Sequence, residues 1–146
     1  MFERFSEKAR RVIFIARRQA SVFGTEKITP ELLLLGMLEE NVQEVCRLIG
    51  CATDACEDLR KKTEESIPRG DPVSLSEDMR VSKELGRVFR YAVQEITGLS
   101  LETVQLGHLL VGILHEEGCK AAELLRVNGA ELKLVRQRMA DGPGFN

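Results

Sequence analysis

Apolar residues near the start of the chain recur at intervals of three and four positions. This spacing places side chains on one face of an α-helix, and the residues concerned are Ala9, Val12, Ile13, Ala16 and Ala20. Ser6 stands where a helix needs an N-cap, and Gly24 is a residue of the type that ends a helix. The pattern therefore predicts a first helix between these two residues.

Three further helices are predicted before residue 67. Thr29, Pro30 and Glu31 supply a hydroxyl cap, a proline at the first helical position and an acidic first turn, which together favour a helix start. The LLLLGML run that follows is apolar almost all round, so this helix is expected to lie centrally. The periodicity predicts a third helix over residues 42–49 and a fourth over residues 53–65.

The second half of the chain repeats the first at an offset of 76 residues, since Ser6 aligns with Ser82 and Arg11 with Arg87. Other identical pairs are Val12 with Val88, Ala16 with Ala92, Leu33 with Leu109, Gly36 with Gly112 and Glu40 with Glu116. The repeat predicts four more helices, over residues 82–96, 104–114, 119–127 and 130–139.

A turn-rich segment, PRGDP at residues 68–72, separates the two copies, and no convincing alternating strand pattern is present. We therefore expect an all-α fold of eight helices, arranged as two pseudo-symmetric four-helix repeats around a shared core. The prediction is a single domain over residues 1–146, with repeat one at 1–67, a linker at 68–80 and repeat two at 81–142.

Composition and charge narrow the classes of function. The chain is 43% hydrophobic, enough for a core, and its formal net charge of -2 gives no general attraction to nucleic acid or to an anionic membrane. It has no apolar run long enough to span a bilayer. The charged start, MFERFSEKARR, lacks the apolar segment of a secretory signal. We therefore expect a cytoplasmic protein without a membrane partner.

The motifs of nucleotide binding and of common catalytic sites are missing from the sequence. There is no GxxxxGK[ST], no GxGxxG, no GxSxG and no HExxH. His108 and His115 are the only histidines, and they lack a third partner at helical spacing for catalysis or metal binding. We expect no enzyme activity, no cofactor and no catalytic or metal-binding residues.

The four cysteines do not have the usual spacings of zinc sites, and they are Cys46, Cys51, Cys56 and Cys119. On one continuous helix, a spacing of five residues turns successive side chains through about 500° and spreads them around the axis. Cys51 aligns with Val127 and Cys56 with Leu132, which indicates apolar positions. We expect core cysteines rather than metal ligands, and disulfides are improbable in a reducing compartment.

Four stretches carry a resemblance to a known family: MFERFSEKARRVIFIARRQA, ITPELLLLGMLEE, VQLGHLLVGILHEEG and LLRVNGAELKLVRQRM. They resemble the Clp N-terminal (Clp N double-repeat) domain family, most closely the amino-terminal domain of ClpC-type ATPases. The resemblance spans essentially the whole chain and includes the duplication. It implies an eight-helix double repeat without catalysis of its own, which receives substrates and adaptor proteins for an ATPase ring that feeds a peptidase.

The resemblance implies one ligand site at the start of the second helix of each copy. In ClpC-type proteins a glutamate there helps to hold the guanidinium of phosphoarginine on marked substrates. The first copy of this chain has Glu31, but the second has Gly107, and the neighbouring threonine positions are Pro30 and Leu106. We expect weak or absent phosphoarginine binding. A simple alternative is that Glu31 complements a helix dipole, which contributes about 0.3–1 kcal/mol.

A second surface implied by the resemblance lies between the first helices of the two copies, where adaptors and cyclic peptides dock in relatives. Phe2 and Arg10 match the family pattern there, while Val81 and Arg90 stand where relatives have an aromatic residue and a polar contact. Phe2 either packs on the core as a hydrophobic staple or anchors a peptide. Phe5 is expected to face the core.

The candidate protein-binding residues are therefore Phe2, Arg10, Glu31, Val81 and Arg90. The expected function is a non-catalytic module that recruits adaptors, or unfolded or marked clients, to a Clp-family ATPase or protease. One alternative is a free-standing accessory subunit that docks on the Clp protease core. The other is a helical nucleic-acid-binding regulator that uses the arginines of the first helix, although acidic residues are interleaved with them and the chain has no Trp for base stacking.

Overall fold

A computed structural model describes residues 2–74 and 80–142 of the chain. The helices in these ranges are α1 (Glu7–Phe23), α2 (Pro30–Ile49), α3 (Thr53–Glu65), α4 (Lys83–Gly98), α5 (Leu106–His115), α6 (Lys120–Val127) and α7 (Leu132–Asp141). Two short strands, β1 (Lys27–Ile28) and β2 (Arg80–Val81), were not predicted, because two residues are too few to show an alternating pattern. The mainly helical class predicted from the periodicity is confirmed.

The predicted number of helices is wrong, because the described residues form seven rather than eight. The expected second and third helices of the first copy are one element, α2, with a kink at Asn41, whose φ of -158° and ψ of 81° are not helical. The Asn41 side-chain oxygen accepts a hydrogen bond from the backbone N–H of Glu44 at 3.1 Å, so the helix restarts at once. In the second copy the position that aligns with Asn41 is followed by Gly118. The helix there, α5, ends before α6 begins.

The helix ends follow the local sequence. Ser6 caps α1 by accepting a hydrogen bond from the N–H of Ala9 at 3.1 Å, and Thr29 caps α2 by accepting one from Leu32 at 3.3 Å. Gly24 ends α1 with a φ of +77°, a left-handed conformation that glycine adopts without strain. These three predictions from the sequence are confirmed.

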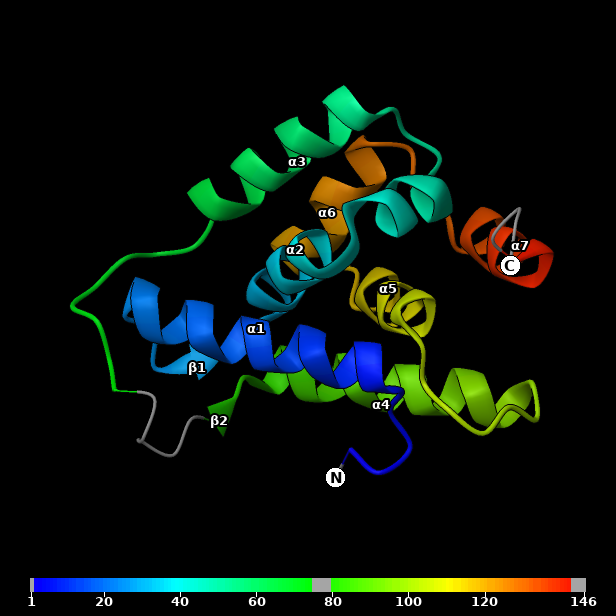
Figure 1. Ribbon diagram of the computed structural model, residues 1–146, viewed down its shortest axis with the longest axis horizontal. Helices are drawn as coiled ribbons and strands as arrows, with labels where there is room; N and C mark the ends of the chain where they lie inside the picture. Colours follow the sequence, from blue (N-terminus) through cyan, green and yellow to red (C-terminus); the bar gives the residue numbers. More distant parts are fainter. Residues whose placement is uncertain (1, 75–79, 143–146) are drawn as a thin grey trace.

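The core is built around α2 and α5. In Figure 1, α1 and α4 both lie on one side of these central helices, where α1 packs on α2 and α4 on α5, while α3 and α6 lie on the other side and α7 lies across one end. Every residue of α5 from Leu106 to Leu114 is buried, as is every residue of α2 from Leu32 to Leu38. Because α2 and α5 also contact each other, the two copies share one core.

Two aligned glycines let the first and second helices of each copy approach closely. A Cβ atom at Gly36 would lie 2.7 Å from the carbonyl oxygen of Val12, and one at Gly112 would lie 2.5 Å from that of Val88. Real Cβ atoms do not come this close to a backbone oxygen. The contacts of α1 with α2 and of α4 with α5 therefore depend on these glycines.

Short backbone pairings link the two copies reciprocally. Ile28, just before α2, pairs in parallel with Val81, just before α4. Phe5, just before α1, pairs in the same way with Val104, just before α5. At the offset of 76 residues Phe5 aligns with Val81, and Ile28 aligns with Val104. Each pairing is therefore equivalent to the other with the two copies exchanged. The division into repeats at 1–67 and 81–142 around a linker stays a proposal, and residues 75–79 of that linker lie outside the described residues.

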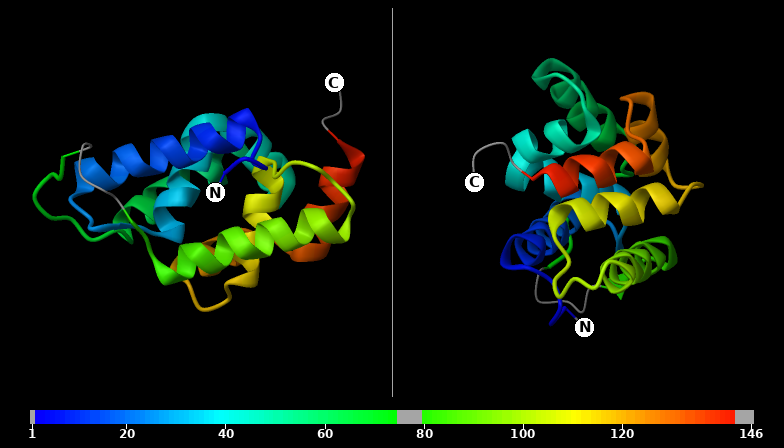
Figure 2. Two further views of the ribbon diagram at one scale, coloured as in Figure 1. Left: turned by 90° about the horizontal axis from the view of Figure 1, so that it is seen from below. Right: turned by 90° about the vertical axis from the view of Figure 1, so that its right-hand side faces the viewer.

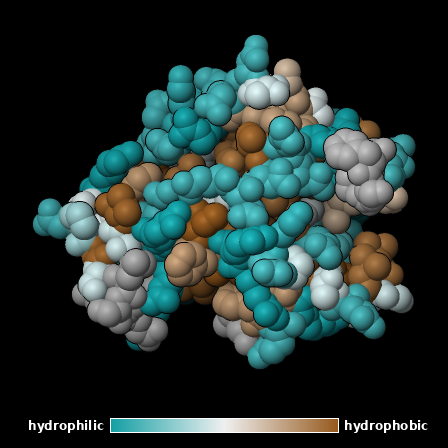
Figure 3. Space-filling model, viewed as in Figure 1, coloured by the Kyte–Doolittle hydropathy of each residue, from teal (hydrophilic) through white to brown (hydrophobic). Residues whose placement is uncertain are grey.

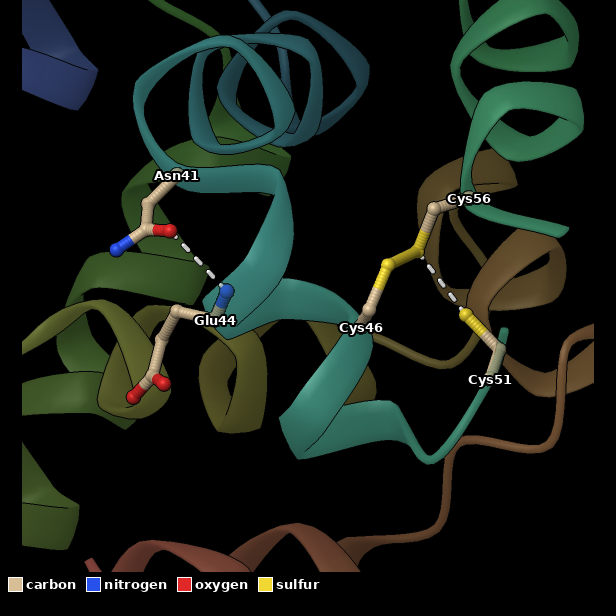
Figure 4. The surroundings of a disulfide bond; sticks show 5 residues. All are labelled: Asn41, Glu44, Cys46, Cys51 and Cys56. Carbon is tan, nitrogen blue, oxygen red and sulfur yellow. Dashed lines mark hydrogen bonds between the residues drawn. A yellow bond between two sulfur atoms is a disulfide. The ribbon is translucent and has the colours of Figure 1, made fainter. Parts of the chain in front are cut away.

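The prediction that the cysteines are not disulfide-bonded is wrong for one pair. Cys46 near the end of α2 and Cys56 in α3 form a disulfide, with their Cα atoms 6.2 Å apart (Figure 4). Gly50, with a φ of +77°, ends α2 and lets α3 fold back beside it, which brings the two sulfurs together. Cys56 is buried, as predicted, while the free cysteines Cys51 and Cys119 are half-buried.

Candidate functional site

The segment before α1 is anchored by three phenylalanines. Phe2 lies 5.1 Å from Phe5 and 5.4 Å from Phe89 between ring centroids, and Phe5 lies 5.6 Å from Phe89, all in edge-to-face arrangements. Phe5 is buried, as predicted, whereas Phe2 is only half-buried. The segment runs between α1 and α4 (Figure 2), so Phe2 is both a packing residue and an accessible one.

The two predicted arginines differ in their contacts. The Arg10 guanidinium donates hydrogen bonds to the carbonyl oxygens of Phe2 and Glu3, both at 3.2 Å, and so holds the segment before α1 in place. Arg90 on α4 is exposed, and its side chain makes no hydrogen bond or ion pair with any residue in the ranges 2–74 and 80–142. Arg90 is therefore the more available of the two for a partner.

Val81 lies in β2, just before α4 (Figure 1). It is half-buried, and its backbone pairs with Ile28. A hydrogen bond thus brings Phe2 and Arg10 together, whereas Val81 is held by its pairing with Ile28.

Sequence reasoning missed an exposed aromatic residue on α1. Phe14 is 58% exposed and lies one helical turn after Arg10. The signal was present, since Phe14 falls outside the apolar stripe that predicts the core face of this helix. Its aligned residue in the second copy is Arg90. Figure 3 shows apolar side chains on this view of the molecule only as separate spots among hydrophilic ones.

Glu31 contacts the other copy. Its carboxylate accepts a hydrogen bond at 2.9 Å from the backbone N–H of Ala121, the second residue of α6. The first N–H groups of a helix have no partner within the helix and carry partial positive charge, so a carboxylate there is stabilising. Glu31 therefore caps α6, rather than only complementing the dipole of its own helix.

The aligned position in the second copy, Gly107, is covered. A Cβ atom there would lie 2.5 Å from the sulfur of Met139, which α7 places over the start of α5. Any side chain at position 107 requires Met139 to move. The two copies thus differ in what covers the position as well as in the residue that occupies it.

A surface depression and a cluster of cysteines have features that favour small-molecule or metal binding, and neither includes a predicted site residue. A depression of about 520 Å³ is lined by Lys61, Glu64, Glu65, Ile67 and Arg69, none of which was predicted as a site residue. The sulfur atoms of Cys46, Cys51 and Cys56 lie within 4.8 Å of one another. Burial raises the pKa of the Cys51 thiol. Burial also raises the pKa of the Cys119 thiol, and the nearby carboxylates of Glu31 and Glu116 act in the same direction.

The helices, the reciprocal pairings and the shared core define a duplicated, mainly helical domain. The model of one such family, the Clp repeat N-terminal domain, matches residues 4–128 of the chain. The chain belongs to this family, as the resemblance implied.

Two curated relatives align with the whole chain. It is 27% identical over 146 residues to a protein of Bacillus subtilis (strain 168) named negative regulator of genetic competence ClpC/MecB, and 29% identical over 146 residues to chaperone protein ClpC1, chloroplastic, of Arabidopsis thaliana. The alignments cover 100% of this chain but only 18% and 16% of those proteins. The chain therefore spans less than a fifth of their length.

Solved structures share the fold. The N-terminal domain of the Caseinolytic protease associated chaperone ClpD from Arabidopsis thaliana superposes with a TM-score of 0.71 at 24% identity, covering 97% of this chain and 95% of that one. The Hsp104 N-terminal domain from Candida albicans superposes with a TM-score of 0.78 at 16% identity, covering 99% of this chain and 94% of that one. In the described residues, no helix is long and apolar enough to cross a membrane.

Proposed function

We propose that this chain is a non-catalytic recognition module that recruits protein clients or adaptors to a Clp-family ATPase. The observation that carries the proposal is the family match over residues 4–128. The partners are the ATPase or protease components, adaptor proteins and unfolded or marked clients. A cytoplasmic location remains a prediction, and some relatives are chloroplastic by name.

The contact surface that we propose consists of Phe2, Arg10, Phe14 and Arg90, and we call it the first-helix surface. Phe14 is exposed one helical turn from Arg10 on α1, and Arg90 is exposed on α4. An exposed aromatic ring and exposed guanidinium groups suit an extended segment that carries apolar and acidic side chains, because aromatic and arginine side chains dominate binding energy at protein interfaces. Val81 extends this surface along the start of α4. Glu31 contributes to the proposed function indirectly, because its carboxylate caps α6.

The alternative of nucleic-acid binding has less support from the contacts of the arginines. Arg11 pairs with Glu40 at 3.3 Å, and the aligned Arg87 pairs with Glu116 at 2.6 Å. Carboxylates thus already neutralise one arginine on the first helix of each copy. The alternative of an accessory subunit on the protease core has no specific observation in its favour.

Client binding is expected to depend on the first-helix surface. Fluorescence anisotropy with a labelled, permanently unfolded protein, such as carboxymethylated α-lactalbumin, measures the affinity. Phe14→Ala and Arg90→Glu are each expected to weaken binding by about fivefold or more, the effect of losing an interface residue worth more than 1 kcal/mol. Both side chains are exposed, so the variants should fold normally.

A matched control is Val127→Ala, because Val127 is 73% exposed on α6. This helix packs against α2, α3 and α5, away from the first-helix surface. Equal weakening by the control would contradict the location of the surface. If pull-downs retain no Clp ATPase, no adaptor and no unfolded client, the proposed function itself is wrong.

Phosphoarginine binding is expected to be weak or absent. The carboxylate of Glu31 is engaged with the N–H of Ala121, and Met139 covers Gly107. Isothermal titration calorimetry with free phosphoarginine should therefore show no binding with a dissociation constant below about 1 mM, which corresponds to a binding free energy of about -4 kcal/mol. Tight binding that is abolished in Glu31→Ala, but kept in a variant of a remote exposed glutamate such as Glu57→Ala, would overturn this prediction.

A further inference from the structure

Three cysteines from separate parts of the chain meet at the turn between α2 and α3. Cys46 comes from α2, Cys51 from the turn itself and Cys56 from the first part of α3. Figure 4 shows the Cys51 sulfur pointing toward the disulfide formed by the other two, and it lies 3.0 Å from the sulfur of Cys56. All three sulfurs lie within 4.8 Å of one another.

The turn, rather than the spacing in the sequence, produces this convergence. Gly50 takes a left-handed conformation and its N–H bonds to the Cys46 carbonyl oxygen at 2.8 Å, while the N–H of Cys51 bonds to the same oxygen at 3.1 Å. Cys51 is thereby folded back over the last turn of α2. Cys56 then faces both sulfurs from α3, which packs along α2.

Such an arrangement has the dimensions of a thiolate metal site. Zinc binds thiolates at about 2.3 Å, so the sulfurs around one ion lie about 3.8 Å apart in tetrahedral geometry. Sulfurs that already lie within 4.8 Å of one another need only side-chain rotations to reach this separation, once the Cys46–Cys56 bond is opened. Thiolate ligands favour soft ions, such as Zn²⁺ and Cu⁺, over Mg²⁺ or Ca²⁺.

We propose that Cys46, Cys51 and Cys56 form a redox-gated binding site for one thiophilic metal ion, with Zn²⁺ as the representative case. A dithiol reductant first transfers two electrons and two protons to the disulfide, giving two cysteine thiols, and is itself oxidised to a disulfide. Zn²⁺ then forms three bonds to sulfur and displaces the three thiol protons to the solvent.

The three ligands leave the fourth position of a tetrahedral ion to water or to an external thiol. Access is from the side of Cys51, which is half-buried, whereas Cys46 is 9% exposed and Cys56 is fully buried. The oxidised state closes the site, because two of its three ligands are then bonded to each other.

The site is independent of the proposed recognition function. In Figure 1 the turn between α2 and α3 lies on the far side of α2 from α1 and α4, which carry the first-helix surface. Metal binding would join the end of α2 to α3, as the disulfide does in the oxidised state. Either state ties α3 to the core.

Titration of the reduced protein with Cd²⁺ and Zn²⁺ tests the proposal. The protein is reduced with a phosphine and desalted without oxygen, and ultraviolet absorption from sulfur-to-cadmium charge transfer is followed. We expect saturation at one ion per chain, and at least about tenfold weaker binding in Cys51→Ser, because even partners outside the ligand shell contribute that much to affinity. Cys119→Ser, which changes the cysteine outside the cluster, should bind as the wild type does.

Binding should also be at least about tenfold weaker in the oxidised protein, in which two ligands are engaged. The proposal is overturned if the reduced wild type does not bind either ion, if Cys51→Ser binds as tightly, or if oxidation has no effect.

A second measurement uses only the wild-type protein and so does not depend on how the variants fold. The reduced chain is alkylated with iodoacetamide with and without Zn²⁺, and the labelled peptides are quantified by mass spectrometry. Zn²⁺ should slow labelling of Cys46, Cys51 and Cys56 relative to Cys119. Equal protection of all four cysteines, or protection of none, would rule out a site at this cluster.

Discussion

Gly112→Ala is expected to destabilise the protein by about 1–2 kcal/mol. The new Cβ atom would lie 2.5 Å from the carbonyl oxygen of Val88, so α4 and α5 must move apart. Overpacking of a core costs about 1–3 kcal/mol and sometimes more, and here the obstacle is backbone rather than a flexible side chain. The gain in helix propensity, about 1 kcal/mol, offsets only part of this cost. Urea denaturation followed by circular dichroism measures the change.

The same helix provides the control. Gly86 lies in α4, and a Cβ atom there would meet nothing within 4 Å. Gly86→Ala should therefore stabilise the protein by up to about 1 kcal/mol through helix propensity alone. Because Gly36 makes the equivalent contact with Val12, Gly36→Ala should destabilise as Gly112→Ala does. If Gly112→Ala were neutral or stabilising, the close contact between α4 and α5 would be wrong.

The wild-type protein is expected to lose stability in mild acid because of His108, and His108→Leu is expected to remove this loss. His108 is 2% exposed, and burial lowers its pKa below the ordinary value of 6.5. The unfolded chain then binds more protons than the folded one once the pH falls below about 6.5. Stability that is fully present above this pH is therefore lost as the pH falls toward the folded-state pKa, by about 1.4 kcal/mol for each unit between the two values.

The contacts of the His108 ring explain the choice of leucine as the substitution. The His108 Nδ1 atom accepts a hydrogen bond from the N–H of Gln105 at 2.8 Å, whereas its Nε2 atom is buried without a partner in the part of the chain that the structure describes. An unpaired buried polar group costs about 1–3 kcal/mol, so leucine removes a cost and also one hydrogen bond. The aligned residue in the first copy, Leu32, is fully buried and shows that leucine fits the equivalent position.

The measurement is the free energy of unfolding between pH 5 and pH 8, a range in which unperturbed carboxylates stay largely ionised. The wild type should lose stability toward pH 5, and His108→Leu should lose much less. His115→Gln, at the exposed histidine, is the control and should keep the wild-type dependence. An unchanged pH dependence in His108→Leu would contradict the assignment to His108.

Part of the candidate site could be predicted from the sequence. The exposed position of Arg90 follows from helical periodicity, because that periodicity separates the solvent face of a helix from its core face. The burial of Phe5 was also expected, although Phe5 precedes α1 and lies outside the helical pattern. Phe14 was overlooked although the same pattern places it outside the core stripe. The half-buried state of Phe2 was not predictable, since it depends on the contact with Phe89, which comes from the other copy.

The sequence by itself determined the helical class, the helix caps and the duplication, because these depend on residues close together in the chain or on its comparison with itself. Only the tertiary structure decided the features that join distant residues. Asn41 kinks α2 without ending it, which made the predicted number of helices wrong. The turn at Gly50 gathers three cysteines that a continuous helix would have spread apart. Glu31 caps α6, whose N-terminus is 90 positions away in the sequence, because folding places the two copies in contact.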